Sequence, residues 1–198
     1  MRHPKPFPRG TVLHFVRHGA TAANLCGLRC GGDLDLPLTD TGRRQAQQVG
    51  LALLHKRVAL RHIVTSDLKR TRETAALIAG VLGSGQAMPA VVVEPTFAER
   101  RLGDWNLTPT ADTEVALRAG LVPPGGEAGD EFHDRIVGAL ERIRPLLGQP
   151  LLVVGSKGVA RVLGELGGMP GRLALDNGVL CQFELGPRFE ELADLEIL

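Results

Sequence analysis

The sequence has almost no excess charge, few cysteines and no long apolar run. Its 23 Lys and Arg residues and 22 Asp and Glu residues leave a formal net charge of +1. No overall field therefore marks the chain as a binder of nucleic acid or of a membrane surface. No apolar run approaches the roughly 18 residues that a membrane-spanning helix needs. Any selectivity for anions must come from arginines placed locally.

The three cysteines give no sign of a metal site or of a disulfide framework. Cys26 and Cys30 lie in one glycine-rich loop, and the neighbouring sequence lacks the further Cys or His residues that a metal would need. A disulfide between them is unfavourable in a reducing cytosol, so we expect two free loop thiols. Cys181 falls in an apolar strand pattern, which indicates a small core residue.

The first ten residues differ in composition from the rest of the chain. They hold basic residues and three prolines but no apolar segment, so they are not typical of a secretory signal. The prolines predict a flexible, extended lead over residues 1–10. Residues 11–198 suffice for one sizeable core, and the hydrophobic content of 43% is ordinary for a globular protein. We expect a single domain over 11–198 and a cytoplasmic location.

Strand-like and helix-like segments alternate along the chain. Short apolar runs predict strands at 12–16, 61–66, 91–94, 151–154 and 180–185. Apolar residues at three- and four-residue spacing predict helices at 39–56, 67–81, 129–147 and 158–166, with a short helix at 112–119. We expect Val12 to be buried with its strand, and Ser66 to cap the second helix. The alternation predicts an α/β domain with a largely parallel sheet.

The first predicted strand ends in Arg17-His18-Gly19. Gly19 stops the strand, because glycine takes unusual backbone angles at no steric cost. Ligands of open α/β sheets bind at the carboxyl ends of strands, where these residues stand. A neutral imidazole can attack phosphorus and carry the phosphoryl group, and an adjacent guanidinium matches phosphate oxygens. The three residues alone are equally compatible with an ordinary strand-end turn.

Further motifs decide between these interpretations. The chain holds, in order, RHGATAAN (17–24), GGDLDLPLTDTGRRQA (31–46), TSDLKRTRETA (65–75), FAERRLGDW (97–105) and PPGGE (123–127). This series resembles the histidine phosphatase superfamily, also called phosphoglycerate mutase-like, over residues 11–161. The resemblance implies a three-layer α/β/α fold with a largely parallel central sheet.

The resemblance also assigns roles in catalysis. It implies that His18 is the nucleophile, that Arg17 and Arg70 hold the phosphate, and that Glu99 is the general acid. Taken alone, Arg70 is one of several basic residues on a helix surface, and such residues are usually solvated. Two arginines, Arg100 and Arg101, follow Glu99; if they stayed near its carboxyl group they would lower its pKa and oppose the role of acid.

Loop residues near the nucleophile match the same pattern. Gly19, Thr21 and Asn24 belong to the first motif, and we expect them to contact the phosphate. Thr and Asn in loops also commonly bond to their own backbone, which is the competing interpretation. Glu127, in the last motif, is expected to be structural, binding backbone N–H groups or an arginine of the active site.

Ser156 is the one serious departure from the family pattern. The segment 151–161 reads LLVVGSKGVAR, and the family has a second histidine where this chain has Ser156. Serine keeps one small donor but loses the reach of the imidazole. Loss of one such donor typically costs about 10²–10³ in rate. Lys157 and the N-terminus of the following helix are expected to compensate in part. The sequence leaves open a weakened phosphatase, a binding protein that has lost catalysis, and an introduced substitution.

The resulting expectation is a phosphomonoester phosphatase acting through a phosphohistidine on His18. No metal and no organic cofactor is implied, and the expected partner is a small phosphorylated substrate or phosphate, with no nucleic acid or membrane. The alternative is an inactive protein that binds a phosphorylated ligand. The resemblance also disfavours mutase activity, because cofactor-dependent phosphoglycerate mutases carry a Tyr and extra basic residues after the acid to hold the substrate carboxylate. This chain has no Tyr, and its cations between Glu99 and Gly125 are Arg100, Arg101 and Arg118. The oligomeric state stays open, a homodimer included.

Overall fold

The computed structural model describes residue 7 and residues 10–168 and 175–185. The strands are β1 (Thr11–Arg17), β2 (His62–Thr65), β3 (Ala90–Val93), β4 (Leu151–Gly155) and β5 (Leu180–Leu185). The helices are α1 (Ala22–Leu25), α2 (Asp40–His55), α3 (Lys69–Gly83), α4 (Thr110–Arg118), α5 (Gly129–Ile143) and α6 (Lys157–Leu166). Short 3-10 helices lie at Pro95–Phe97, Gly103–Trp105 and Arg144–Leu146. Most of the expected N-terminal lead, residues 1–10, lies outside the described residues.

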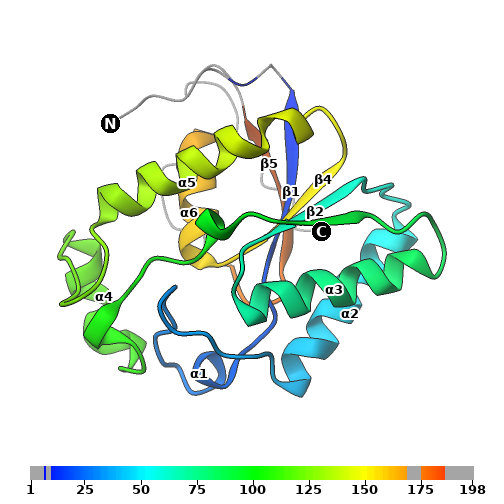
Figure 1. The fold of residues 1–198 in the computed structure, drawn as a ribbon. Coiled ribbons are helices and arrows are strands. Elements are labelled where there is room, and N and C mark those ends of the chain that lie inside the picture. The colour runs from blue at the N-terminus through cyan, green and yellow to red at the C-terminus, as the bar shows by residue number, and fades with distance from the viewer. Residues whose placement is uncertain (1–6, 8–9, 169–174, 186–198) are drawn as a thin grey trace.

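The five strands form one sheet in the order β3-β2-β4-β1-β5. β3, β2, β4 and β1 run parallel, and β5 pairs antiparallel with β1 at the edge. The prediction of a largely parallel α/β sheet is therefore confirmed. Because parallel strands end at the same edge, the loops after β1, β2 and β4 lie together at one end of the molecule (Figure 1).

Helices cover both faces of the sheet, and β4 shows why. Leu151 and Val153 point into a core shared with α5 and α6, whereas Leu152 and Val154 point into a core shared with α2 and α3. All five residues of β4 are buried, as a strand covered on both faces requires. In Figure 1, α2 and α3 lie together on one side of the sheet and α5 and α6 on the other. This is the three-layer α/β/α fold that the resemblance implied.

Three local expectations were wrong. Val12 is 43% exposed: it faces the same side of β1 as Val16, but it lies at the start of the strand, outside the core with α2 and α3 that buries Val16. Helix α3 begins only at Lys69, and Ser66 does not cap it: the Ser66 hydroxyl bonds to the Thr71 hydroxyl over 2.7 Å. Helix α5 stops at Ile143, because Pro145 cannot continue the α-helical hydrogen bonds and a 3-10 turn follows.

Among the described residues, no helix is long and apolar enough to cross a membrane. The three cysteines are free thiols, with Cys26 exposed, Cys30 partly buried and Cys181 buried, as the sequence predicted.

Candidate functional site

β1 and β4 end side by side and bring two buried polar residues together. Arg17 pairs with Gly155 in the sheet, and the N–H of His18 donates to the Gly155 carbonyl over 2.9 Å. The next residue after each strand, His18 and Ser156, therefore leaves the sheet next to the other. Each has only 3% of its surface exposed.

The surroundings of His18 define the state of its imidazole ring. Nδ1 lies 2.8 Å from the carbonyl oxygen of Gly19. A carbonyl only accepts, so Nδ1 carries the proton and Nε2 keeps its lone pair. Burial lowers the pKa of His18 well below 6.5, and the charges of Arg70 and Arg17 lower it further against the Gly19 bond. At neutral pH, His18 is thus an uncharged ring that can attack an electrophile through Nε2.

Half-buried Arg17 and fully buried Arg70 flank this ring and are held by backbone carbonyls. Arg17 donates from one terminal nitrogen to the Leu175 carbonyl over 2.7 Å. Arg70, in the first turn of α3, is fully buried and donates to the carbonyls of Leu34 over 2.7 Å and Gly31 over 3.0 Å. Arg70 is therefore not a solvated surface residue, although its place off the apolar stripe of α3 would fit one.

Several buried donors at this edge of the sheet have no partner within the described protein. The buried side-chain atoms without a hydrogen bond in the described part of the chain are Nε of Arg17, Nε of Arg70, Oγ of Ser156 and Nδ1 of His62. Arg17 ends β1, Arg70 and Ser156 follow the carboxyl ends of β2 and β4, and His62 begins β2 at the other end. Buried donors are almost always bonded, so three without a partner at one edge are suited to the oxygens of a bound anion.

Gly19 is required by packing. A Cβ atom there would lie 2.2 Å from the carbonyl oxygen of Gly42, in the first turn of α2. The Gly19 N–H donates to the Thr74 hydroxyl over 3.1 Å, so this N–H is already bonded within the protein. Its expected contact with phosphate stays a prediction.

Thr21 and Asn24 bond to each other in a capping box that starts α1, a short helix that the sequence did not predict. The Thr21 hydroxyl accepts from the Asn24 N–H, and the Asn24 side-chain oxygen accepts from the Thr21 N–H over 3.1 Å. The side chain of Asn177 donates to that same oxygen and to the carbonyl of His18. These oxygen atoms shape the loop, and their expected contact with phosphate stays a prediction.

Glu99 reaches the start of α6 from the segment after β3. Its two carboxylate oxygens accept the N–H of Arg100 over 2.7 Å and the N–H of Gly158 over 2.9 Å. Ser156 is the N-cap residue of α6, but its hydroxyl makes no capping bond. Glu99 therefore satisfies a free N–H of the first turn that a capping serine commonly bonds. Lys157 is exposed.

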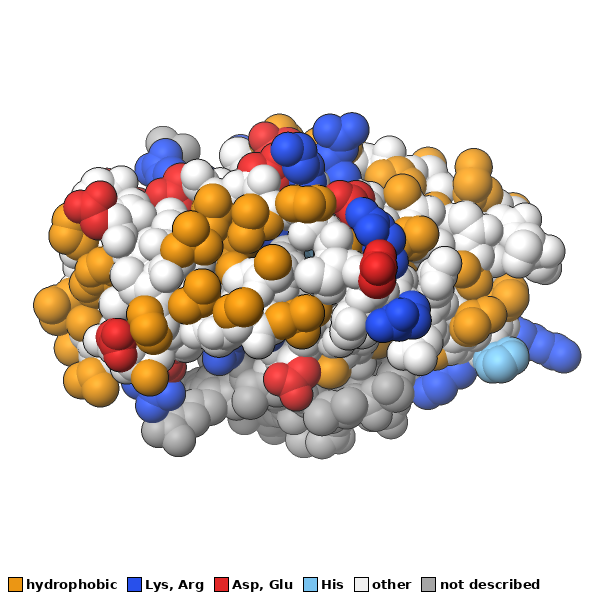
Figure 2. All heavy atoms as spheres, turned by 90° about the horizontal axis from the view of Figure 1, so that it is seen from below, with side chains coloured by type: hydrophobic (Ala, Val, Ile, Leu, Met, Phe, Trp, Pro, Cys, Tyr) orange, Lys and Arg blue, Asp and Glu red, His pale blue; other side chains and the backbone are white. Residues whose placement is uncertain are grey.

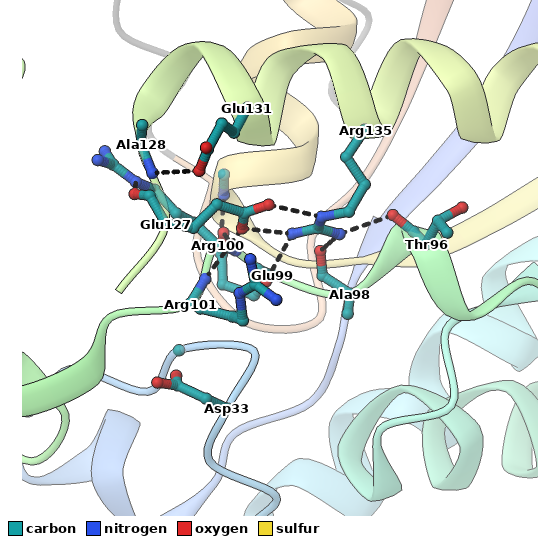
Figure 3. Close-up of polar contacts among 12 residues, drawn as sticks. Asp33, Thr96, Ala98, Glu99, Arg100, Arg101, Glu127, Ala128, Glu131 and Arg135 are labelled. Atoms are coloured by element: carbon teal, nitrogen blue, oxygen red, sulfur yellow. Dashed lines mark hydrogen bonds and ion pairs between the residues drawn. The ribbon is translucent and has the colours of Figure 1, made fainter. Parts of the chain in front are cut away.

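The arginines after Glu99 do not pair with its carboxylate. The guanidinium of Arg100 donates to the carbonyls of Glu127 and Leu121 over 2.8 and 3.3 Å. The backbone N–H of Arg101 donates to the Glu127 carboxylate over 3.2 Å. Glu127 binds a backbone N–H, as the sequence suggested. Its arginine partner is Arg135 of α5 rather than Arg17 or Arg70 (Figure 3).

Two parts of the site gave no signal in the sequence. Residues 175–177 supply the Leu175 carbonyl for Arg17 and the Asn177 amide for the His18 carbonyl, across more than 150 residues of chain. Arg135 holds the backbone around Glu99 from α5. In the sequence Arg135 is one charged residue on the polar side of an amphipathic helix, and no motif marks it.

Figure 2 looks onto the end of the molecule where the parallel strands finish. Charged side chains of both signs gather on one half of this face, and hydrophobic side chains gather on the half toward α4. The exposed large hydrophobic residues of α1, α4 and the segments beside α4 are Leu25, Leu107, Val115, Leu121 and Val122. Within the described ranges, no three His, Cys, Asp or Glu side chains are grouped as a metal site would need.

Comparison with known proteins shows which family this chain is similar to. The family model of the histidine phosphatase superfamily (branch 1) matches residues 13–195. The probable phosphoglycerate mutase GpmB of Photorhabdus laumondii is 34% identical over 188 residues, covering 87% of this chain and 84% of that protein. Phosphoglycerate mutase-like protein 4 of Arabidopsis thaliana is 36% identical over 162 residues, covering 76% of this chain and 68% of that protein.

Among solved structures, a mycobacterial glucosyl-3-phosphoglycerate phosphatase in complex with VO3 superposes with a TM-score of 0.71. It is 29% identical in sequence, and the match covers 86% of this chain and 90% of that one.

Proposed function

The chain belongs to the histidine phosphatase superfamily, and from this premise we propose that it is a phosphomonoester phosphatase acting through a phosphohistidine on His18. One observation carries the proposal. The His18 ring is buried and uncharged, with its Nε2 lone pair free, beside three buried donors that lack a protein partner. An electron pair next to donors for anionic oxygens is what attack on a phosphate ester requires.

In the first proposed step, Nε2 of His18 attacks phosphorus and the bond from phosphorus to the ester oxygen breaks. Arg17, Arg70 and Ser156 donate to the phosphoryl oxygens, where charge gathers in the transition state. Glu99, in its protonated form, gives its proton to the departing oxygen. Each carboxyl oxygen has two lone-pair sites and the backbone bonds use one on each, so a site for this proton remains.

In the second step, water attacks the phosphohistidine. Glu99, now a carboxylate, takes one proton from the water, the bond from phosphorus to Nε2 breaks, and inorganic phosphate forms. The Nε2 lone pair and the protonated Glu99 are thereby restored. Apart from the attacking water, every group in this cycle belongs to the chain or to the phosphate ester, so the proposal needs no cofactor.

Ser156 sets the expected strength of the activity. Its hydroxyl stands next to His18 in the place of the family's second histidine, and it can donate one bond to a phosphoryl oxygen. It cannot supply the positive charge of an imidazolium. We therefore propose a rate lowered by about 10²–10³ relative to the same site with a histidine.

The names of the relatives do not decide between hydrolysis and mutase chemistry, and the cations near the site favour hydrolysis. A phosphoglycerate carries a carboxylate that needs a cationic partner. Between Glu99 and Gly125, Arg100 is bonded to carbonyls and Arg118 is paired with Glu114 over 2.7 Å. The charge of Arg101 acts on the Glu127 carboxylate, whose pKa it helps to lower. The exposed apolar residues toward α4 instead suit an uncharged leaving group.

Ser156 also favours a second candidate, a protein that binds a phosphorylated ligand without turning it over. The buried donors would hold such a ligand equally well, because binding and catalysis use the same contacts to phosphate. The two candidates differ only in whether His18 becomes phosphorylated.

The test is hydrolysis of an aryl phosphate by the protein, with His18→Ala as the blank and Ser156→His as the repaired site. The proposal expects activity clearly above the blank and an increase of about 10²–10³ in Ser156→His. If the native chain is no more active than the blank and hydrolysis appears only in Ser156→His, the result favours the binding protein. No activity above the blank in either protein would reject the phosphatase.

A further inference from the structure

A side chain of α5 binds the backbone of the segment that carries Glu99. Residues 96–101 have a single short 3-10 turn, Pro95–Phe97, and otherwise no regular structure. Arg135 of α5 donates to three successive parts of this segment: the carbonyls of Thr96 over 2.7 Å, Ala98 over 2.9 Å and Glu99 over 3.2 Å. Figure 3 shows the guanidinium reaching from α5 into the bend of the chain.

Glu127 completes the coordination of Arg135. Its two oxygens accept from Nε over 2.8 Å and from a terminal nitrogen over 2.7 Å, a two-pronged ion pair. All five N–H groups of the guanidinium are thus bonded. Only 2% of Glu127 is exposed; burial alone would raise its pKa, but the bonds and charge of Arg135 outweigh burial and lower it. The pair is therefore ionised and fixed in one orientation.

The same carboxylate also holds the segment on the other side of Glu99. The N–H of Arg101 donates to Glu127, and the guanidinium of Arg100 donates to the Glu127 carbonyl. The backbone is thus bound before, at and after Glu99. The Glu99 side chain has only its own rotations left, and the N–H groups of Arg100 and Gly158 restrict these.

We propose that Arg135 and Glu127 are a positioning pair that places the Glu99 carboxyl group against the start of α6, where it serves proton transfer to the leaving group. Neither side chain contacts the reacting atoms. The catalytic part of this inference rests on the proposed function, but the placement of Glu99 does not.

Arg135→Lys keeps the positive charge but has three donors on one nitrogen instead of a planar fork of five. It cannot bond two carboxylate oxygens and three carbonyls together, so the segment gains freedom. Arg142→Lys is the matched control. Arg142 lies two turns later on α5 and binds the start of the same segment at Glu94 and Thr96, but not Glu99.

The first readout compares leaving groups. An alkyl phosphate needs a proton on its leaving oxygen, whereas nitrophenyl phosphate does not. Glu99→Gln should slow alkyl phosphate hydrolysis by about 10²–10⁴, and Arg135→Lys by about 10² because a displacement of about 1 Å can have that effect. These losses refer to kcat/KM, which reports the phosphorylation of His18 and not the later attack of water that Glu99 also assists. Both variants should leave kcat/KM for nitrophenyl phosphate nearly unchanged, and Arg142→Lys should change kcat/KM for neither substrate. If Arg135→Lys lowers kcat/KM equally for both substrates, Arg135 has only a structural role and the positioning role is rejected.

The second readout needs no turnover. The Gly158 amide reports directly on its bond to Glu99 by NMR. Glu99→Gln and Arg135→Lys should move the Gly158 amide resonance in the same direction and speed its hydrogen exchange, and Arg142→Lys should not. Glu127→Gln, which keeps the side-chain shape, should act like Arg135→Lys and stands in for it if that variant does not fold. A Gly158 amide that stays unchanged in Arg135→Lys and Glu127→Gln overturns the inference, even in a protein that proves to have no phosphatase activity.

Discussion

The two sides of the candidate site are built in different ways. The strand-end cluster, consisting of Arg17, His18, Arg70 and Ser156, stands where regular elements end or begin, so the sheet and α3 place its residues directly. The Glu99 arm, consisting of residues 96–101, belongs to no strand or α-helix. The side chains of Arg135, in α5, and of Glu127, just before α5, bond to its backbone and hold it.

This difference has a physical consequence. Moving a residue of the strand-end cluster requires deforming a buried sheet, whose backbone bonds are formed cooperatively. Moving Glu99 requires only that a few hydrogen bonds open, each with a net contribution of about 1 kcal/mol. The two sides are therefore expected to fail separately, with different dependence on the leaving group, and the following predictions rely on that separation.

The largest effect is expected at the centre of the strand-end cluster. His18→Ala should lower turnover by about 10⁴-fold or more, because the nucleophile acts with its partners as a unit. The affinity for inorganic phosphate, compared by calorimetry between His18→Ala and the native chain, should change little, since the donors remain. His55→Ala, at the exposed end of α2, is the control and should retain full activity. Retained turnover in His18→Ala would exclude this nucleophile.

Arg70→Lys is expected to have the next largest effect, about 10²–10³ in kcat/KM. The lysine cannot keep the carbonyls of Gly31 and Leu34 bonded while also donating toward the phosphate. The loss should be equal for alkyl and nitrophenyl phosphates, in contrast to the Glu99 arm. Arg72→Lys, exposed on the same helix, should be silent; a loss that depends on the leaving group would contradict the separation of the two sides.

Gly158→Ala should damage only the Glu99 arm. A Cβ atom at position 158 would lie 2.1 Å from a carboxylate oxygen of Glu99, so the flexible carboxylate must move. Alkyl phosphate hydrolysis should fall about tenfold to 10²-fold, while the melting temperature holds or rises because alanine favours the helix. Gly80→Ala, in α3 with open space around it, is the matched control for the helix effect. An unchanged rate on alkyl phosphate would show that Glu99 tolerates the displacement.

The smallest expected effect is the acid dependence of stability due to His18. Its pKa is lowered in the folded protein, so below about pH 6.5 the unfolded chain binds a proton that the folded chain does not. The free energy of unfolding should therefore decrease as pH falls below that value, by up to about 1.4 kcal/mol per pH unit from this group. The folded protein is thus less stable in acid. Denaturant unfolding of His18→Gln should show a shallower decline than the native chain, with His55→Gln as the control. Identical slopes would mean that His18 is not held uncharged.

The strand-end cluster was largely predictable, and the Glu99 arm was not. Apolar periodicity located the strands, and Arg17, His18 and Ser156 adjoin strand ends in the sequence itself. Burial of Arg70 did not follow from periodicity, because the loop that covers it, residues 31–34, approaches from a distant part of the chain. Glu127 was recognised as structural, but its partner Arg135 depends on how α5 packs against residues 96–101, which no local pattern encodes. Nor did the sequence show that the Ser66 hydroxyl bonds to the Thr71 hydroxyl rather than capping α3.

The most direct test of the central claim is to look for phosphate on His18 during turnover. Trypsin cleavage after Arg17 and Arg29 gives a peptide, residues 18–29, in which His18 is the only histidine. Rapid quenching in alkali of a reaction with nitrophenyl phosphate, followed by mass spectrometry, should find a phosphorylated form of this peptide that mild acid removes. The proposed mechanism predicts that the modification appears before phosphate is released and is absent from His18→Ala. If nitrophenyl phosphate is hydrolysed steadily but no phosphorylated form of this peptide is found, the proposed mechanism is contradicted.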